Sequence, residues 1–535
     1  MTTKNGRKLP AGTLAFLGAG PGDPGLLTLR AAELLGTADL VVTDAAEAVE
    51  VLARCRPEAE IVAVPEGAPA ERAKPLIAAV KAGRNTVRLV AGDPLGPRGS
   101  AEEVEACAKS SLTFEVVPGV PAALAVPAYA GISLPARRSA EVRILDLRAA
   151  TPDWTAVATG GAAITLLGDV DDLPAAAAAL VAYGRAPSTR IAVTVAGTTV
   201  AQQTVVATLS EVAAELAAAG VTGEAVAVVG DAVGSRERLS WFETKPLFGW
   251  QLLVPRTKEQ AATLSEKLRS HGGVPIEVPT IAVEPPRTPA AMDRAVKGLV
   301  SGRYLWVAFT STNAVRAMRE KFESLGLDVR AFAGIRLAAV GEATADALRT
   351  WGIEPELVPT DQQSSEGLLE VWPAYDDVFD PIDRVLLPRA DIATETLAAG
   401  LVERGWQVDD VTAYRTVRAA PPSAEIRDAI KGGGFDAVLF TSSSTVRNLV
   451  GIAGKPHAST VIAVIGPQTA KTAEELGLRI DVLAPQPTVS ALAEATAEFA
   501  LARRQSGEVG RPSARSARSR GAAKAAKAAV KPAAQ

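Results

Sequence analysis

Two hydroxyl-rich segments are the first part of this sequence that could bind a ligand. The segment TSTN at 310–313 recurs as TSSS at 441–444, and each copy follows an apolar run and precedes a helical pattern. At such strand-to-helix turns, hydroxyls and free backbone N–H groups lie at the carboxyl edge of a sheet, where anionic ligands bind. Two edges of this kind facing each other would form a cleft suited to a large polycarboxylate.

A second repeated phrase follows each hydroxyl-rich segment. GEATA at 341–345 corresponds to GPQTA at 466–470, and a further glycine stands eleven residues after the start of each phrase. A duplication on this scale predicts two related α/β lobes. Thr344 and Thr469 occupy equivalent turns, where their hydroxyls either bind carboxylates or cap their own helices.

A glycine-rich turn near the start of the chain offers a different chemistry. GAGPGDP at 18–24 follows a predicted strand and precedes a predicted helix. Its glycines permit a tight turn and the close approach of a ligand to the backbone. A plain tight turn explains the same residues, so this motif alone does not decide between the two.

The elements around these motifs divide the chain into several α/β units. Its 535 residues exceed one ordinary core, and short apolar strands alternate with helical segments along it. We expect a two-subdomain domain at 12–242, a linker at 243–249, and a bilobal domain at 250–498. The expected parts of the bilobal domain are lobe 1 at 250–282 plus 418–498, lobe 2 at 283–411, and two hinge strands at 279–285 and 411–417.

Composition restricts the class of protein. Apolar residues make up 48% of the chain and aromatic residues only 4%, which is typical of aliphatic α/β cores. The only cysteines are Cys55 and Cys107 and the only histidines are His271 and His457, so no Cys/His metal cluster can form and we expect no disulfide framework. No apolar run reaches the ~18 residues of a membrane span, and no signal-peptide pattern is present. We therefore expect a soluble, cytoplasmic protein.

The net charge of −4 conceals a basic C-terminal segment. Residues 503–535 carry nine Lys or Arg and one Glu in a background rich in Ala, Ser and Pro. This composition predicts a disordered tail. The tail lacks the interleaved aromatic residues of a nucleic-acid-binding segment, and the rest of the chain is acidic, so we expect no specific nucleic-acid partner.

Residues 12–240 resemble the tetrapyrrole methyltransferases, in particular uroporphyrinogen-III C-methyltransferase. The matching phrases are LAFLGAGPGDPGLLTLRAAELLGTADLVVTD at 14–44, GDP at 92–94, the run 116–135 and AGTTVAQQ at 196–203. The resemblance implies S-adenosylmethionine binding between two subdomains, a homodimer formed through this half, and a catalytic aspartate at Asp44. The implied cofactor-binding residues are Pro21, Ala91, Gly92, Asp93, Pro121, Ala122, Leu167 and Gly197.

The chain departs from this family where an anionic tetrapyrrole would bind. The family continues its Gly-Asp-Pro with Phe and an Arg-Gly-Gly-Glu-Glu run, whereas this chain reads LGPRGSAEE at 95–103. Thr43 replaces the tyrosine usually found before the catalytic aspartate, and Leu167 replaces a methionine of the cofactor pocket. Two alternatives remain: a domain that methylates uroporphyrinogen III to precorrin-2, or an inactive scaffold, since a fold can outlive its chemistry.

Residues 250–498 resemble uroporphyrinogen-III synthase along essentially their whole length. The matching segments, in the family's order and spacing, include LLVPR at 252–256, FTSTNAV at 309–315, AVGEATADAL at 339–348, LLPRA at 386–390 and LVERGWQVDDVTAYRTV at 401–417. The resemblance implies two α/β lobes joined by a two-stranded β ladder, and no cofactor. It also implies the substrate hydroxymethylbilane, a linear tetrapyrrole that is closed to uroporphyrinogen III with its last ring inverted.

The implied reaction needs a proton for the departing hydroxyl and donors for the substrate carboxylates. Tyr414 lies on the predicted hinge, and the resemblance makes it the acid; the alternative is a half-buried strand tyrosine with a satisfied hydroxyl. Arg256 and Arg389, at strand ends, either pair with propionates or lie free at the surface. The candidate substrate-binding residues are Arg256, Thr310, Ser311, Thr312, Asn313, Thr344, Ser364, Ser365, Arg389, Thr441, Ser442, Ser443, Ser444 and Thr469.

A two-lobed ligand-binding or sensor protein would share this hinge and cleft. The lack of a secretory signal and the tyrosine on the hinge favour an enzyme instead. The preferred interpretation is a fused enzyme whose second half makes uroporphyrinogen III, and whose first half either methylates that product or serves as a scaffold.

Overall fold

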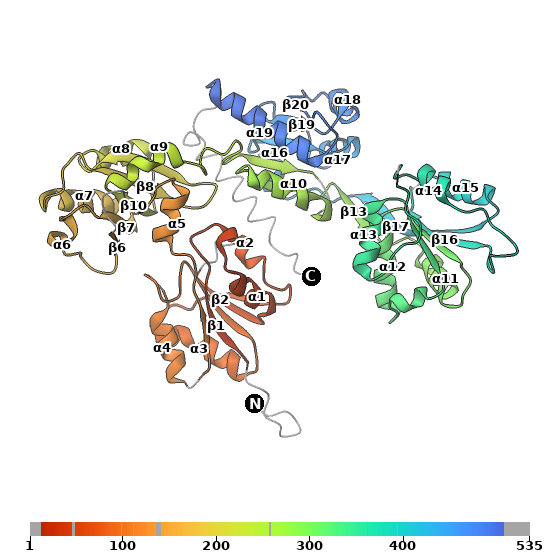
Figure 1. Ribbon diagram of the computed structural model, residues 1–535, viewed down its shortest axis with the longest axis horizontal. Coiled ribbons are helices and arrows are strands. Elements are labelled where there is room, and N and C mark those ends of the chain that lie inside the picture. Colours follow the sequence, from red (N-terminus) through yellow and green to blue (C-terminus); the bar gives the residue numbers. More distant parts are fainter. Residues whose placement is uncertain are drawn as a thin grey trace.

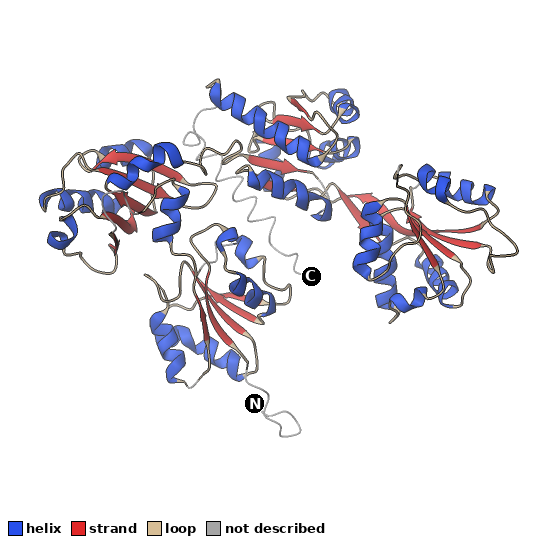
Figure 2. Ribbon diagram, viewed as in Figure 1, coloured by secondary structure: helices blue, strands red, loops and turns tan. Residues whose placement is uncertain are grey.

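The computed structural model describes residues 12–44, 49–97, 99–110, 112–134, 141–255, 258–360, 362–392 and 394–507. Within these residues the chain forms four five-stranded sheets. Figure 1 shows the four units in chain order, and Figure 2 shows helices on the flanks of each sheet. The predicted substrate residue Arg256 and residues 508–535 of the predicted tail lie outside the described residues.

The first sheet is entirely parallel. Its elements are β1 (Leu14–Gly18), β2 (Leu40–Thr43), β3 (Glu60–Ala63), β4 (Thr86–Val90) and β5 (Glu115–Val117), with α1 (Leu29–Thr37), α2 (Val49–Leu52), α3 (Pro69–Lys81) and α4 (Ala101–Lys109). The strand order is β3-β2-β4-β1-β5. Every residue of β1 is buried, because separate cores lie on the two faces of the sheet. The turns after β1, β2 and β4 therefore share one edge of the sheet.

The second sheet is mixed and follows directly. Its elements are β6 (Val142–Asp146), β7 (Ala163–Asp169), β8 (Arg190–Val195), β9 (Gln203–Thr208) and β10 (Glu224–Val229), with α5 (Ala122–Tyr129), α6 (Trp154–Ala158), α7 (Leu173–Ala182), α8 (Val212–Ala219) and α9 (Arg236–Leu239). The strand order is β6-β7-β10-β8-β9, and only β6 and β7 pair in parallel. Leu173, Leu180 and Leu216 of α7 and α8 fill the core on one face. Helix α5, which leaves the first sheet, packs on the second and so ties the two subdomains together.

The third sheet, lobe 1, is assembled from two separated parts of the chain. Its elements are β11 (Gln251–Val254), β12 (Val274–Glu277), β18 (Ala437–Phe440), β19 (Val461–Val464) and β20 (Val482–Leu483), with α10 (Lys258–Ser270), α16 (Ala424–Gly432), α17 (Ser443–Ala453), α18 (Pro467–Glu475) and α19 (Val489–Gln505). The parallel strand order is β12-β11-β18-β19-β20. Strands β18 and β19 are wholly buried, as their unbroken apolar runs predict.

The fourth sheet, lobe 2, is inserted between the two parts of lobe 1. Its elements are β13 (Ile281–Glu284), β14 (Trp306–Phe309), β15 (Arg336–Ala339), β16 (Arg384–Ala390) and β17 (Gln407–Arg418), with α11 (Pro289–Val300), α12 (Thr312–Ser324), α13 (Glu342–Trp351), α14 (Ser365–Val371) and α15 (Thr396–Glu403). The strand order is β13-β17-β16-β14-β15.

Strand β17 belongs to both the lobe 2 sheet and the connection between the lobes. It pairs in parallel with β16 up to Tyr414, and then antiparallel with β13, from Arg415 opposite Glu284 to Arg418 opposite Ile281. In Figure 1, α17 and α18 lie on the side of lobe 1 nearest lobe 2, and α12 and α13 lie on the facing side of lobe 2. The predicted bilobal α/β fold with a two-stranded hinge is confirmed.

The predicted linker at 243–249 is a packed connection. Leu247 is fully buried in the core of lobe 1. Phe242 meets Phe248 edge to face, with ring centroids 5.3 Å apart, and also packs on Tyr129 of α5 at 4.7 Å. These aromatic contacts join the N-terminal half to lobe 1 through buried apolar surface.

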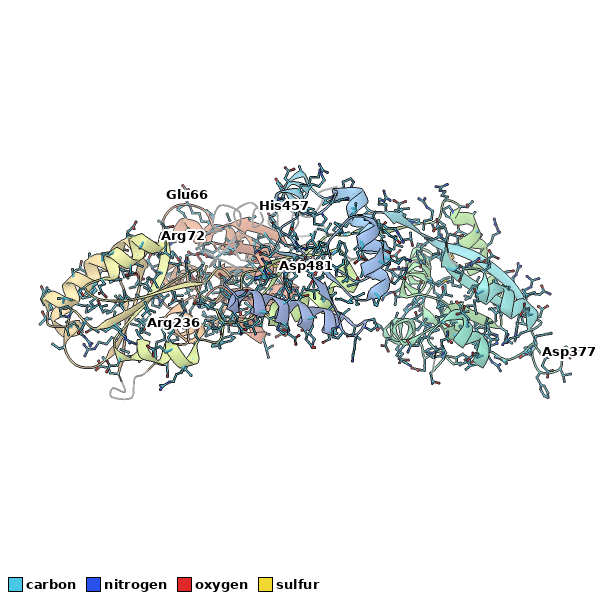
Figure 3. The ribbon with its side chains drawn as sticks, turned by 90° about the horizontal axis from the view of Figure 1, so that it is seen from above. Glu66, Arg72, Arg236, Asp377, His457 and Asp481 are labelled. Atoms are coloured by element: carbon cyan, nitrogen blue, oxygen red, sulfur yellow. The ribbon has the colours of Figure 1, made fainter. Side chains whose placement is uncertain are left out.

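An ion pair fixes the same junction. Arg236 of α9, labelled in Figure 3, pairs with Glu243. Glu243 also accepts hydrogen bonds from Gln202 at 2.8 Å and Thr204 at 2.6 Å. The side chains of Arg236 and Glu243 are 16% and 17% exposed, so salt screens this pair less than it screens a surface pair.

The last helix extends beyond the predicted end of lobe 1 at 498. Helix α19 runs to Gln505, and Arg504 donates hydrogen bonds to the backbone carbonyls of residues 244–246 at 3.1–3.3 Å. Burial lowers the pKa of this guanidinium. Arg503 and Arg504, which we expected in the tail, therefore belong to a folded helix that clamps the junction.

The described residues offer neither a membrane span nor a metal centre. None of their helices is both long enough and apolar enough to cross a bilayer. Nor do they contain a group of three or more His, Cys, Asp or Glu that could hold a metal ion. Cys55 and Cys107 are free thiols, and burial raises the pKa of Cys107 to about 11.

A fragment spanning 244–507 is expected to fold on its own, because the core of lobe 1 includes Leu247 near one end and Ala500 near the other. The shorter fragment 249–499 loses both residues and the Arg504 clamp. We expect its free energy of unfolding to be lower by about 3 kcal/mol. This is roughly the contribution of one fully buried leucine, with smaller additions from the lost alanine and the lost hydrogen bonds.

Urea unfolding followed by tryptophan fluorescence measures both fragments. The longer fragment carrying Leu247→Ala is the matched control and should fall between them. Equal midpoints for the two fragments would contradict a core that reaches into the linker and the end of α19.

Candidate functional site

A bulge in β17 aims Tyr414 at the first hydroxyl-rich turn. Arg389 and Ala390 are neighbours on β16, yet they pair with Thr412 and Tyr414, so β17 carries one extra residue there. Side chains of a regular strand alternate between faces, but the bulge brings Ala413 and Tyr414 into the same core. Tyr414 is 7% exposed and is the last residue before the ladder.

The Tyr414 hydroxyl meets Ser311 at the N-terminus of α12. The two oxygens lie 2.9 Å apart, and either can be the donor. Ser311 is also the N-cap of α12, since its oxygen accepts a hydrogen bond from the Ala314 N–H at 3.2 Å. Ser311, which we expected to be free for a substrate carboxylate, is therefore engaged by the predicted acid.

The remaining polar residues of this turn differ in exposure. Thr312 is exposed, and Asn313 is half-buried and accepts a hydrogen bond from Arg316 at 3.2 Å. Thr310 and its equivalent Thr441 are half-buried at the ends of β14 and β18. Thr312 is thus the most accessible hydroxyl of the turn.

The second turn of lobe 2 is covered by a side chain. Thr344 is 6% exposed, and the N–H of Glu342, at the start of α13, donates to the Gln363 side-chain oxygen at 3.2 Å. Ser364 caps α14 by accepting from a backbone N–H at 3.2 Å, and Ser365 is the first residue of that helix. A carboxylate binding at α13 would have to displace the Gln363 amide.

The hydroxyls of lobe 1 are largely engaged with one another and with the backbone. Ser442 caps α17, accepting from a backbone N–H at 3.3 Å, and its oxygen lies 2.9 Å from that of Ser444. Ser443 donates to the Gln468 carbonyl at 3.0 Å and so joins the turns that start α17 and α18. Thr469 is 5% exposed. Among these hydroxyls, the exposed one is that of Ser444.

Arg389 is a structural residue in this conformation. It is 8% exposed and forms a bidentate pair with Asp410 on the adjacent strand. It also donates to the Thr394 carbonyl and lies 3.5 Å from Glu395. The hydrogen bonds that Arg389 donates to Asp410 raise the pKa of Arg389. The predicted pairing with a substrate propionate is therefore replaced by an ion pair that supports the β16–β17 edge.

Three cations on lobe 1 and the hinge were not among the predicted site residues. Arg418 ends the ladder with its guanidinium against Gly451 of α17. Arg447 of α17 reaches the Thr472 hydroxyl at 3.5 Å, and Lys471 is exposed on the first turns of α18. In the described part of the chain, none of the three cations forms an ion pair.

In lobe 2, the turn that starts α13 is equivalent to the turn that starts α18, and its charges are paired with one another. Asp346 stands where lobe 1 has Lys471, and Glu342 begins the helix. Arg349 pairs with Glu342 at 2.6 Å and with Asp346 at 2.8 Å. The two copies have therefore diverged in charge at this turn, and aligning them is the sequence signal that would have revealed Lys471.

In the N-terminal half, three strand ends pack backbone against backbone. Gly20 and Gly92 exchange two hydrogen bonds, at 3.2 and 3.0 Å. A Cβ on Gly18 would lie 2.4 Å from Gly119 and 2.5 Å from the Gly92 oxygen, so only glycine fits there. The Asp93 carboxylate accepts two backbone N–H groups, one of them from Gly119, each at 2.9 Å. Asp93 thus organises these turns.

A strained loop from the second sheet closes over the glycine-rich turn. Thr198 has a positive φ of 65°, which is costly for a β-branched residue. Its hydroxyl accepts a hydrogen bond from the Asp23 N–H at 3.0 Å. A Cβ on Gly22 would lie 3.1 Å from the Gly197 oxygen. The predicted cofactor residues Pro21 and Gly197 therefore lie in adjoining turns from different subdomains.

The other predicted cofactor residues meet at α5. Leu167 of β7 is 8% exposed and packs in a small core with Ala122 and Val126 of α5. Pro121 stands at the N-cap position of that helix. A Cβ on Gly197 would lie 2.5 Å from Val126, so this loop approaches α5 closely. The structure thus brings Pro121, Ala122, Leu167 and Gly197 into one region.

Asp44 is held by a buried arginine. Arg88, 1% exposed, lies 2.9 Å from Asp44 and 2.7 Å from Glu103, which is also 1% exposed. Burial alone would lower the pKa of Arg88, but the hydrogen bonds to Glu103 and Asp44 outweigh it and raise that pKa. The Ala91 N–H, at 3.3 Å, gives Asp44 a second donor. Asp44 is therefore a fixed carboxylate at the sheet edge, beside the glycine turns.

Two family models match consecutive parts of the chain. The model for uroporphyrinogen-III synthase HemD matches residues 262–494, and the model for tetrapyrrole (corrin/porphyrin) methylases matches residues 13–213. A porphyrin biosynthesis protein HemD from Ruminiclostridium josui is 30% identical over 502 residues, which covers 91% of this chain and 98% of that relative. The chain belongs to the HemD family of porphyrin biosynthesis proteins. This HemD chain shares both halves with that relative.

Two further matches cover the N-terminal half of this HemD chain. Siroheme synthase 2 from Aeromonas hydrophila is 36% identical over 246 residues, which covers 44% of this chain and 52% of that relative, so the match spans about half of its length. A solved uroporphyrin-III C-methyltransferase from Thermus thermophilus, complexed with S-adenosylhomocysteine, is 30% identical with a TM-score of 0.37. It covers 42% of this chain and 99% of that structure.

We predict that Arg88→Met destabilises the methylase half, residues 12–242, by about 3 kcal/mol, because it leaves the buried Glu103 carboxylate with only the half-buried Arg72, 3.3 Å away, as a partner among the described residues. Differential scanning calorimetry of the full chain should show the first unfolding transition at a lower temperature than in the unmodified chain. Arg88→Met combined with Glu103→Leu removes both charges and should recover most of the loss. Arg30→Met, which breaks exposed pairs with Glu33 and Glu115, is the control, and an equally large effect there would refute the buried network's role.

Proposed function

We propose that this HemD chain closes hydroxymethylbilane to uroporphyrinogen III, with inversion of the last ring and loss of water. The observation that carries the proposal is the placement of Tyr414, whose hydroxyl stands at the junction of the lobe 2 sheet and the hinge, beside a helix N-terminus. The family's enzymatic identity favours this function over a two-lobed ligand-binding protein.

In the proposed reaction, Tyr414 donates its phenolic proton to the terminal hydroxyl of the substrate. The C–O bond then breaks, its electron pair stays with the oxygen, and water departs. The substituted α-carbon of the last ring attacks the carbon left behind and forms a spiro intermediate. The bond that joined this ring to its neighbour then breaks, and the ring's free α-carbon bonds to the neighbour instead, which inverts the last ring. The protein contributes the proton, the folded geometry and a site that holds the reacting ends together.

The substrate carboxylates are proposed to bind the helix N-termini that face the hinge, with Thr312 and Ser444 as accessible hydroxyl donors. The unpaired cations Arg447 and Lys471 give lobe 1 the more positive surface, whereas the lobe 2 acids are already paired with Arg349. Lobe 1 is therefore proposed to hold most of the carboxylates, while lobe 2 supplies the acid.

The methylase half is proposed to bind S-adenosylmethionine, which supplies a methyl group when it is bound. A Cβ on Gly92, φ +75°, would meet nothing within 4 Å. This open backbone, together with Pro21, Ala122 and Gly197, fits a ligand that lies against the main chain. The two thiols and the fused architecture are consistent with a cytoplasmic enzyme, proposed to dimerise through this half.

Tetrapyrrole capture by the methylase half is proposed to be poor. Where the family has Phe and an Arg-Gly-Gly-Glu-Glu run after Gly-Asp-Pro, this chain presents Leu95, 57% exposed, and Ser100, a buried serine whose hydroxyl has no hydrogen-bond partner. Carboxylates without partners would stay in water. The alternative role of this half is a scaffold packed on lobe 1 through Phe242 and Leu247.

Tyr414→Phe should lower kcat for uroporphyrinogen III formation by about 10²-fold with little change in KM, because it removes the general acid and keeps the ring packed. Stopped-time assays with hydroxymethylbilane measure the effect. Tyr304→Phe is the matched control, since Tyr304 is equally buried but bonds Asp409 at the opposite edge of the lobe 2 sheet. An unchanged rate for Tyr414→Phe would assign the proton to another donor.

Incubation of the whole chain with hydroxymethylbilane and methyl-labelled S-adenosylmethionine tests the N-terminal half. We expect cofactor binding at a Kd of roughly micromolar or weaker, unlabelled uroporphyrinogen III as the main product, and slow labelling of precorrin-2. Calorimetric titration of the cofactor alone separates binding from transfer. Rapid label incorporation would contradict the proposed loss of tetrapyrrole capture and establish a bifunctional enzyme.

A further inference from the structure

We propose that Ser311 positions Tyr414 and stabilises the phenolate that remains after proton transfer; this rests on the proposed synthase reaction. Among the described residues, Ser311 provides the only side chain that hydrogen-bonds the Tyr414 hydroxyl, at 2.9 Å. The tyrosine is 7% exposed and its ring is packed in the lobe 2 core, so it has little freedom to reach another partner.

The hydrogen-bonding capacity of Ser311 determines where the phenolic proton points. A serine hydroxyl has one donor and two lone pairs, and the Ala314 N–H occupies one lone pair at 3.2 Å. In one arrangement Tyr414 donates to the second lone pair, and its proton stays between the two residues. In the other, Ser311 donates to the Tyr414 oxygen, and the phenolic proton is free for the substrate. Rotation about two C–O bonds exchanges these arrangements without moving a heavy atom.

The location of Ser311 also favours negative charge on Tyr414. Ser311 caps α12, a helix of 13 residues, and a helix N-terminus carries partial positive charge. A hydrogen bond from Ser311 to a phenolate is charge-assisted and roughly twice as strong as one between neutral groups. The contact therefore strengthens as the proton leaves, which stabilises the transition state more than the bound substrate.

The protons balance over the cycle. Tyr414 protonates the terminal hydroxyl, the C–O bond breaks with its electron pair on oxygen, and water is released. When the free α-carbon of the last ring has formed the closing bond, it loses its proton and the ring regains aromaticity; that proton returns to the Tyr414 phenolate. Ser311 keeps its own proton throughout, so it is a positioning residue and not a second acid.

The internal duplication separates this role from helix capping. Ser442 occupies the equivalent position in lobe 1 and caps α17 in the same way, accepting from a backbone N–H at 3.3 Å. Its other close contact at 2.9 Å is the Ser444 hydroxyl and not a tyrosine. Capping accounts for a serine in both lobes, but only the lobe 2 copy touches the proposed acid.

Ser311→Gly is the decisive variant, because glycine at an N-cap retains most of the capping preference but has no hydroxyl. We expect kcat for uroporphyrinogen III formation to fall about tenfold with KM unchanged, as when one hydrogen bond of the transition state is lost. Ser311→Thr keeps both hydroxyl and cap and should restore kcat to within about threefold. Ser423→Ala removes the cap of α16, outside the site, and should leave kcat unchanged.

Thermal unfolding of each variant confirms that it is folded before kinetics are compared. The proposal would be overturned if Ser311→Gly kept the kcat of the unmodified chain. It would also be overturned if Ser311→Thr lost as much kcat as Ser311→Gly. An equal fall in kcat for Ser423→Ala would also overturn it, because capping would then be the cause. Failure of the unmodified chain to make the type III isomer would contradict the proposed function itself, so the two failures are distinguishable.

Discussion

The pairing of β17 is the constraint on which the synthase half depends. One strand of 12 residues is held by β16 inside lobe 2 and by β13 in the hinge, and it changes partner immediately after Tyr414. Because parallel and antiparallel pairing have different hydrogen-bond patterns, the register of the strand is fixed on both sides of that point. The bulge at Ala413 then turns Tyr414 into the lobe 2 core, where Ser311 holds its hydroxyl.

Duplication supplied two lobes with the same architecture, and divergence gave them different chemistry. Both lobes cap a helix with serine at the same turn, but only lobe 2 places a tyrosine against that serine. Lobe 1 instead has Lys471, and its Arg447 forms no ion pair with the described residues, whereas the lobe 2 counterpart Arg316 lies 3.8 Å from Glu320. These differences support the proposed division, in which lobe 1 holds the carboxylates and lobe 2 supplies the proton, because the lobes otherwise offer equivalent helix N-termini.

The methylase half shows how a fold persists while a binding surface changes. Gly18 and Gly119 are required by backbone contacts that no other residue permits, and Gly92 is favoured by its positive φ of 75°, whatever ligand is bound. Arg88 lies between two carboxylates in the same region, and losing it would leave the buried Glu103 with only Arg72 as a partner in the described part of the chain. Leu95 is exposed, so neither a close backbone contact nor a buried charge restricts the residue at this position. This explains why the chain departs from the family in the loop after Gly-Asp-Pro.

The sequence predicted those features that are periodic or repeated. The duplicated turns, the hinge strands and the glycine-rich turn follow from local patterns, and the structure places each at a carboxyl edge or in the ladder. The contact between Ser311 and Tyr414 could not be predicted, because a bulge depends on the register between two strands. For the same reason the Arg389–Asp410 pair was hidden, and Arg389 looked available for substrate. The buried linker was missed because the partners of Leu247 lie in distant segments.

The isomer composition of the product tests the account most directly. The full chain, freed of small molecules by dialysis, is mixed with hydroxymethylbilane without S-adenosylmethionine, and the oxidised porphyrins are separated by chromatography. The account predicts the type III isomer, formed faster than uncatalysed closure, because the acid at the hinge and the folded substrate geometry belong to the protein. Type I isomer alone, formed at the uncatalysed rate, would contradict it.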